Sequence, residues 1–118
     1  MRGIWIVLFG FSVLLLSACG GQSASSSSAP NEVAVTLKEF SIEPKELKAK
    51  AGKVTFVVKN AGAIEHDFAI DGAGKIETVL PGETKKLEVT LTAGTKDVIC
   101  SLAGHKEAGM VAKLTVSP

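Results

Sequence analysis

Short runs of alternating apolar and polar residues constrain the fold of this chain more than any other feature of its sequence. The clearest runs cover residues 33–38, 53–59, 86–92 and 113–117. A period of two residues is typical of strands with one apolar face. Turn-forming pairs such as Pro81-Gly82 and Ala93-Gly94 separate the runs. We therefore predict an all-β protein, an antiparallel β-sandwich of seven or eight strands, with at most one helical turn over residues 43–47.

The N-terminal segment has a different composition and predicts an export signal. A short basic start is followed by an apolar run from Ile4 to Leu16, which is shorter than the roughly 20 residues of a membrane-spanning helix. Such a run is typical of a signal peptide. The next residues, Leu16 to Cys19 (LSAC), resemble the bacterial lipobox, in which cleavage precedes a cysteine that receives a lipid. An uncleaved anchor is the alternative, and either outcome places the rest of the chain outside the cytoplasmic membrane.

These observations divide the chain into three parts. We expect a signal peptide over residues 1–18, then a lipidated Cys19 and a flexible Gly/Ser linker over 19–31, and one globular domain over 32–118. The localisation we expect is exported and lipid-anchored, facing the periplasm or the cell exterior. Thirteen basic side chains against twelve acidic ones give a net charge of +1, so we expect no nucleic-acid partner. We also expect a monomer.

All the soft or imidazole side chains of the predicted domain can reach one place. They are His66, Cys100, His105 and Met110. Strand parity predicts that His66 begins one inward face, Cys100 ends another and Met110 begins a third. A loop over 101–109 between antiparallel strands would bring Cys100 and Met110 to the same end of the sandwich. His66 would join them there if its strand neighbours either of these two.

Taken one at a time, these residues have ordinary structural explanations. A buried cysteine packs as a small hydrophobe, a methionine fills gaps, and each histidine can serve as a polar core or loop residue. Together, however, one thiol, two imidazoles and a thioether are the donor set of a blue-copper centre. Zinc gains little from a thioether, and hard ions prefer oxygen. The set therefore predicts a single mononuclear copper ion.

The region from Val33 to Ser117 resembles the cupredoxin family. The family motif is an upstream histidine followed, much later, by Cys, His and Met. The spacing Cys100-x4-His105-x4-Met110 resembles the longer ligand loop of rusticyanin-like and auracyanin-like members. The resemblance implies a Greek-key sandwich and a type 1 copper site in a bacterial lipoprotein. In that site His66, Cys100 and His105 would be equatorial ligands and Met110 the axial ligand.

The resemblance also implies contacts around the ligands. We expect the Cys100 sulfur to accept hydrogen bonds from the Phe68 amide and from one amide within Leu102–Gly104. Asp67 has two open interpretations: it either orients residues of the ligand loop or is simply solvated.

The sequence favours electron transfer over catalysis. Cys100 is flanked by Ile99 and Ser101, so the His-Cys-His arrangement that connects copper centres in multicopper enzymes is absent. We therefore expect no enzyme activity. The predicted function is a membrane-tethered, extracytoplasmic type 1 copper protein that carries single electrons by Cu(I)/Cu(II) cycling and exchanges them with a redox protein such as a cytochrome or an oxidase. The alternatives are copper delivery, storage or sensing, and, less favoured, a metal-free interaction module.

Overall fold

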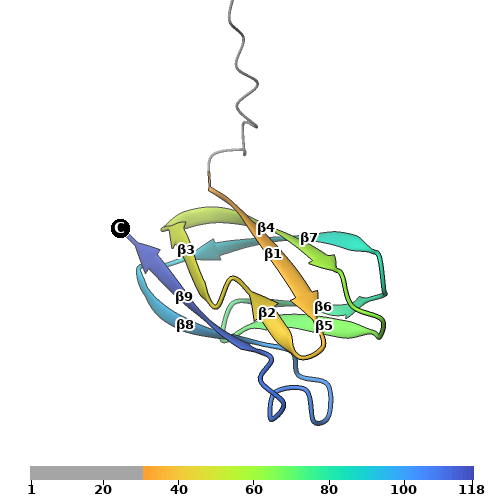
Figure 1. Cartoon of the computed structure of the whole chain (residues 1–118). Coiled ribbons are helices and arrows are strands. Elements are labelled where there is room, and N and C mark those ends of the chain that lie inside the picture. The colour runs from red at the N-terminus through yellow and green to blue at the C-terminus, as the bar shows by residue number, and fades with distance from the viewer. Residues whose placement is uncertain (1–30) are drawn as a thin grey trace, which may run out of the picture.

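The computed structural model describes residues 31–118, and this part of the chain is built from strands and turns. The predictions for the signal peptide over 1–18, for lipidation of Cys19 and for most of the linker lie outside the described residues. No helix of the described part is long and apolar enough to cross a membrane. The strands, labelled in Figure 1, are β1 (Glu32–Lys38), β2 (Ser41–Glu43), β3 (Glu46–Lys50), β4 (Gly52–Asn60), β5 (His66–Ile70), β6 (Gly74–Val79), β7 (Thr84–Leu91), β8 (Gly94–Ile99) and β9 (Val111–Ser117).

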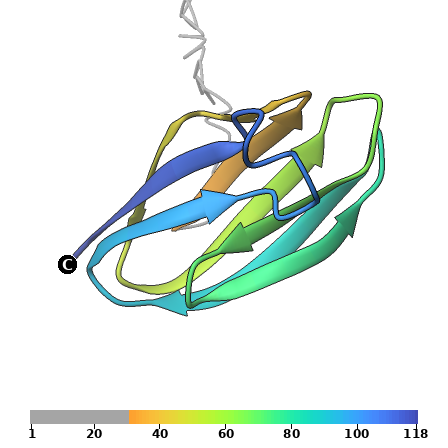
Figure 2. The ribbon, with the colours of Figure 1, turned by 90° about the horizontal axis from the view of Figure 1, so that it is seen from below.

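The strands form two sheets that pack face to face, as Figures 1 and 2 show. One sheet has the order β2-β1-β4-β7 and the other has the order β3-β9-β8-β5-β6. The predicted all-β sandwich is thus confirmed. It differs in two details: the described residues contain nine strands, and the pairs β1–β4 and β3–β9 are parallel. Alternation reveals which residues face the core but carries no information about strand direction, so the sequence did not predict these parallel pairs.

The one helical turn that the sequence allowed over residues 43–47 does not form, because this segment crosses from one sheet to the other. β2 pairs with β1, and after Pro44 the chain joins β9 as β3. The Lys113 amide donates to the Lys45 carbonyl at 2.8 Å. Ile42 and Leu47 are both buried at this crossing, so pairing and burial outweigh the weak local preference for a turn of helix.

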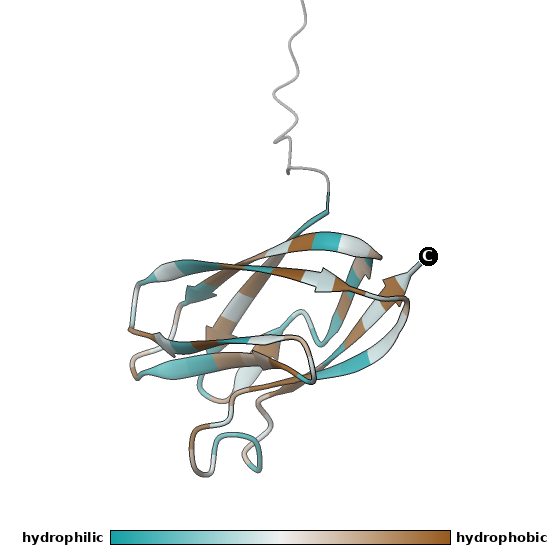
Figure 3. Cartoon of the chain, turned by 180° about the vertical axis from the view of Figure 1, so that it is seen from behind, coloured by the Kyte–Doolittle hydropathy of each residue, from teal (hydrophilic) through white to brown (hydrophobic). Residues whose placement is uncertain are grey.

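The core lies between the two sheets and follows the predicted alternation. Figure 3 shows apolar and polar residues alternating along the strands, and in β1 the buried positions are Val33, Val35 and Leu37. Phe56 and Phe68, from opposite sheets, meet with ring centroids 5.6 Å apart. The rest of the buried set is dominated by Val, Ile, Leu and Ala.

The topology brings three chain segments to one end of the sandwich. β5 is the antiparallel neighbour of β8, and β8 is the antiparallel neighbour of β9. The start of β5, the end of β8 and the start of β9 therefore lie side by side. The loop of residues 100–110 protrudes at this end, and the described chain enters β1 at the other end (Figure 1).

Candidate metal centre

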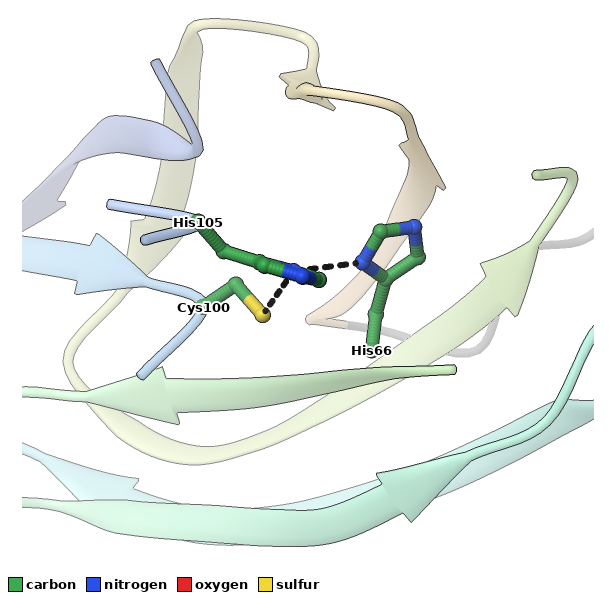
Figure 4. A group of neighbouring side chains, drawn as sticks. All are labelled: His66, Cys100 and His105. Atoms are coloured by element: carbon green, nitrogen blue, oxygen red, sulfur yellow. Dashed lines mark hydrogen bonds between the residues drawn. The ribbon is translucent and has the colours of Figure 1, made fainter. Parts of the chain in front are cut away.

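His66, Cys100 and His105 converge at the end of the sandwich where β5, β8 and β9 meet (Figure 4). The Nδ1 atoms of the two histidines are 3.2 Å apart, and His105 Nδ1 is 3.4 Å from Cys100 Sγ. All three donor atoms lie within 4.8 Å of one another. His66 and Cys100 are fully buried, whereas His105 is half-buried. The convergence predicted from strand parity is therefore present.

Backbone hydrogen bonds shape the loop that carries His105. The His105 amide donates to the Leu102 carbonyl at 3.0 Å. The Met110 amide donates to the His105 carbonyl at 3.1 Å, and the Cys100 amide donates to the Met110 carbonyl at 3.1 Å. These bonds close the loop on itself and hold His105 over the ends of β8 and β9.

Met110 lies directly before β9 and is fully buried. Its backbone bonds to Cys100 and His105 place it beside both of these residues. Its side chain belongs to the apolar core. The structure thus brings the fourth candidate to the same end of the sandwich, and its role as an axial ligand stays a prediction.

The spacing of the three donor atoms fits a single ion. Nitrogen and sulfur atoms that bind one tetrahedral or trigonal ion lie about 3.3–3.7 Å apart, given metal–ligand bonds of the usual length. The separation of the two Nδ1 atoms, 3.2 Å, and that of His105 Nδ1 from Cys100 Sγ, 3.4 Å, are close to that range, and the third pair of donors lies within 4.8 Å. One thiol and two imidazoles suit copper better than a hard cation. The residues present therefore fit a copper ion.

Asn60 shapes the loop that leads into His66. Its buried amide group donates to the carbonyls of Ile64 and Val79, both at 2.8 Å, and its Oδ1 accepts from the Gly62 amide at 2.9 Å. One side chain thus fixes the turn over 61–65 and connects it to β6. His66 begins β5 directly after this turn.

Glu39, which the sequence analysis missed, contacts the far side of the His66 ring. Its Oε1 lies 2.9 Å from His66 Nε2. The carboxylate also accepts hydrogen bonds from the amides of Ala63 and Ile64. These contacts, with the Ala63 amide as the largest contribution, hold the pKa of Glu39 below its ordinary value. No motif includes Glu39, so nothing in the sequence pointed to this contact.

Asp67 orients the ligand loop, which decides between the two interpretations left open by the sequence. Its carboxylate is buried and accepts a hydrogen bond from the Ser101 amide at 2.6 Å and another from the Ser101 hydroxyl. Lys75 Nζ lies 3.2 Å from the same carboxylate. Burial acts to raise the pKa of Asp67, but the hydrogen bonds from Ser101 outweigh it, and the pKa lies below its ordinary value.

The backbone amide that donates to the Cys100 sulfur belongs to Asp67, and the prediction of Phe68 is wrong. The Asp67 amide lies 3.4 Å from Sγ. The physical reason is an irregularity of β5 between His66 and Phe68, where the pairing with β6 shifts register and turns the Asp67 amide inward. The second donor, expected within Leu102–Gly104, stays a prediction. Burial raises the pKa of the Cys100 thiol, and the hydrogen bond from the Asp67 amide partly offsets the increase.

His105 faces the surface, and an exposed aromatic side chain covers one side of its ring. The ring centroids of Phe40 and His105 are 5.1 Å apart with an interplanar angle of 76°, an edge-to-face contact. Phe40 itself is 42% exposed. Of the three converging residues, His105 is therefore the one nearest to solvent.

Comparison with known proteins agrees with this architecture. The model of the family described as "Cupredoxin-like domain" matches residues 7–116. The chain is 27% identical over 166 aligned positions to the "Copper-resistant cuproprotein CopI" of Pseudomonas aeruginosa, covering 95% of this chain and 92% of that protein. It is 34% identical over 95 residues to the protein of the same name from Vibrio cholerae, where the alignment covers 63% of this chain and about half, 53%, of the relative.

Solved structures with the same fold include two auracyanins. The dithionite-reduced auracyanin of Roseiflexus castenholzii superposes with a TM-score of 0.69 at 19% identity, covering 76% of this chain and 99% of that one. Auracyanin A of Chloroflexus aurantiacus, described as a "blue" copper protein, gives a TM-score of 0.67 at 22% identity, covering 75% and 100%. At this level of identity the likeness shows the fold.

Proposed function

The chain belongs to the cupredoxin-like domain family, and on that premise we propose that it holds one mononuclear type 1 copper ion. His66 Nδ1, Cys100 Sγ and His105 Nδ1 would form the ligand plane, with the Met110 thioether as a weaker axial ligand. One observation carries the proposal: three donor atoms from separate segments lie within 4.8 Å of one another.

We further propose that this centre carries single electrons. When bound, copper would supply the Cu(I)/Cu(II) couple. The chain supplies a rigid set of donors, because His66 and Cys100 lie in or directly after paired strands and both side chains are fully buried. His105, half-buried beside the exposed Phe40, offers the shortest path from the ligand plane to the surface. A redox protein such as a cytochrome or an oxidase is the partner we propose.

The proposal includes the location of the protein. Residues 1–18 would serve as a signal peptide and Cys19 as the lipidated residue, on the strength of the sequence Leu16 to Cys19. The domain would then face the periplasm or the cell exterior, tethered to a membrane.

Copper handling is the second candidate. The names of the two relatives, both "Copper-resistant cuproprotein CopI", favour it. Such a protein would bind copper for delivery, storage or sensing at the same residues without passing electrons.

The first experiment tests the centre itself. We expect the purified full chain to develop an intense visible absorption on addition of one equivalent of Cu(II), because a thiolate bound to Cu(II) absorbs strongly. Cys100→Ala should lose this band completely. Cys19→Ala is the matched control, since it removes the other cysteine and should keep the band. A colourless wild-type protein, or a coloured Cys100→Ala variant, would refute the copper centre.

A second measurement separates electron transfer from copper handling. A carrier should keep its copper through repeated cycles of reduction and reoxidation by a small redox protein, with the visible band lost and fully recovered each time. Release of the ion on reduction, measured with a Cu(I)-specific chelator, would favour copper handling over electron transfer.

A further inference from the structure

We propose that Glu39 is a positioning residue: its carboxylate selects which nitrogen of His66 faces the ion and biases the centre toward the oxidised ion. The second half of this inference rests on the proposed function, whereas the first concerns the protein even without metal.

The hydrogen bonds around Glu39 determine the protonation of the His66 ring. The carboxylate lies in the turn between β1 and β2 and accepts from the amides of Ala63 at 3.0 Å and Ile64 at 3.2 Å. Its third contact is with His66 Nε2, at 2.9 Å. A carboxylate surrounded by N–H groups acts as an acceptor, so Nε2 carries the ring proton. The lone pair is then on Nδ1, the atom that faces Cys100 and His105.

The chain leaves room for this carboxylate at Gly62. A Cβ atom added at Gly62 would clash with Glu39 Oε1. Any other residue here would push the carboxylate away from the loop and from His66. The position of the Glu39 carboxylate against the turn over 61–65 therefore depends on a glycine at position 62.

The charge of Glu39 is the basis for the second half of the proposal. The His66 ring between the carboxylate and the ion is fully buried, and the Glu39 side chain is only 30% exposed, so solvent screens the interaction incompletely. Together, the Cys100 thiolate and the Glu39 carboxylate offset both charges of a cupric ion but leave one excess negative charge around a cuprous ion. The buried Asp67 differs from Glu39 in having a cationic partner, Lys75 at 3.2 Å, which it shares with the exposed Glu77. A neutral buried site is favoured over a charged one.

The charge is tested by comparing two substitutions that remove one carboxylate each. Glu39→Gln keeps an acceptor oxygen for His66 and loses the charge. Glu65→Gln is the matched control, because Glu65 is exposed and precedes His66 without contacting its ring. Redox titration of the copper-loaded full chain should show the Cu(I)-to-Cu(II) affinity ratio rising at least about tenfold in Glu39→Gln, which is about 59 mV for one electron. Glu65→Gln should change the ratio less than about twofold.

The position of the ring proton is tested without metal. Imidazole nitrogen chemical shifts of the metal-free protein should show His66 protonated on Nε2 in the wild type and in Glu39→Gln. Glu39→Ala, which removes the acceptor, and Gly62→Ala, which displaces an intact carboxylate, should both give a mixture of the two neutral forms. Circular dichroism checks that each variant is folded.

Three results would overturn the inference. These are a wild-type His66 protonated on Nδ1, an unchanged proton position in both Glu39→Ala and Gly62→Ala, and equal affinity ratios in Glu39→Gln and Glu65→Gln. They differ from failure of the proposed function, in which the wild-type protein would not bind copper at all.

Discussion

Two carboxylates flank the first candidate ligand, and the structure treats them differently. Asp67 is buried and satisfied by Ser101 and Lys75, so its role is to fix the loop that follows Cys100. Glu39 lacks a lysine or arginine within ion-pair distance in the described part of the chain, and its contacts are the His66 ring and two amides. At the scale of single residues, the Asp67 carboxylate therefore fixes the position of the ligand loop, whereas the Glu39 carboxylate contributes a net negative charge beside His66.

Ser101 provides a direct test of the loop anchor. Ser101→Ala removes one of the hydrogen bonds to the buried Asp67 carboxylate, and we expect the metal-free protein to lose about 1–2 kcal/mol of unfolding free energy in urea. Ser117→Ala is the control, because its hydroxyl makes only a 3.3 Å bond to the Ala49 carbonyl at an exposed position. Equal losses in the two variants would contradict the anchoring role of Asp67.

At the scale of strands, the β8–β9 hairpin carries a cross-strand ion pair that contributes to stability in a pH-dependent way. Asp97 and Lys113 lie opposite each other, with Oδ1 and Nζ 2.6 Å apart. The hydrogen bond from Lys113 lowers the pKa of Asp97, and the same bond raises the pKa of Lys113. Both shifts show that folding favours the charged forms.

The sign of the pH effect follows from these directions. The contribution of Asp97 is complete above the ordinary aspartate pKa and is lost as the pH falls through the lower pKa of the folded state. The contribution of Lys113 is complete below the ordinary lysine pKa and is lost as the pH rises through its raised value. Asp97→Asn should therefore reduce the loss of stability in acid, measured by urea unfolding from pH 6 down to pH 2.

Because both side chains of this pair are more than half exposed, the effect should be small and should weaken in high salt. Asp71→Asn is the control, since Asp71 is exposed and forms no ion pair among the described residues. If Asp71→Asn flattens the acid slope as much as Asp97→Asn does, the pair has no specific role.

Strand parity predicted the convergence of the site because it rests on a strict rule. Residues two apart share a face, so His66, Cys100 and Met110 could be placed at inward ends of strands. The resemblance to the family, not this rule, implied a sulfur contact from Phe68, and the shifted register of β5 gives that contact to Asp67 instead. Local irregularities of this kind leave no mark on an alternation pattern.

Contacts between distant segments could not be predicted from the sequence for a different reason. Glu39 reaches His66, and Phe40 covers His105, from the turn between β1 and β2. Parallel pairing of β1 with β4 brings this turn to the end of the sandwich that holds the site. Since parallel pairing has no local signature, neither residue could be connected to the ligands before the topology was known.

At the scale of the whole molecule, metal binding and folding should be coupled. The three donor atoms come from β5, from the end of β8 and from the following loop, so the site exists only in the folded sandwich. We expect copper at a free concentration one hundred times its dissociation constant to stabilise the protein by about 2.7 kcal/mol.

This coupling is measured by urea unfolding under anaerobic conditions, with and without Cu(I). The transition midpoint of the wild type should rise on adding the metal, and that of Cys100→Ala should rise much less. An equal rise in both proteins would mean that copper binds elsewhere on the chain.

The direction in which the chain runs through the sandwich determines how the candidate centre is presented. The described chain enters at Asn31, and β1, seven residues long, carries it across the domain to Glu39 beside His66. At about 3.3 Å per residue, this strand spans about 23 Å. The chain therefore enters the described domain at the end opposite the candidate centre, where the half-buried His105 is the converging residue nearest to solvent. A redox partner that contacts His105 would therefore meet the domain at the end away from Asn31.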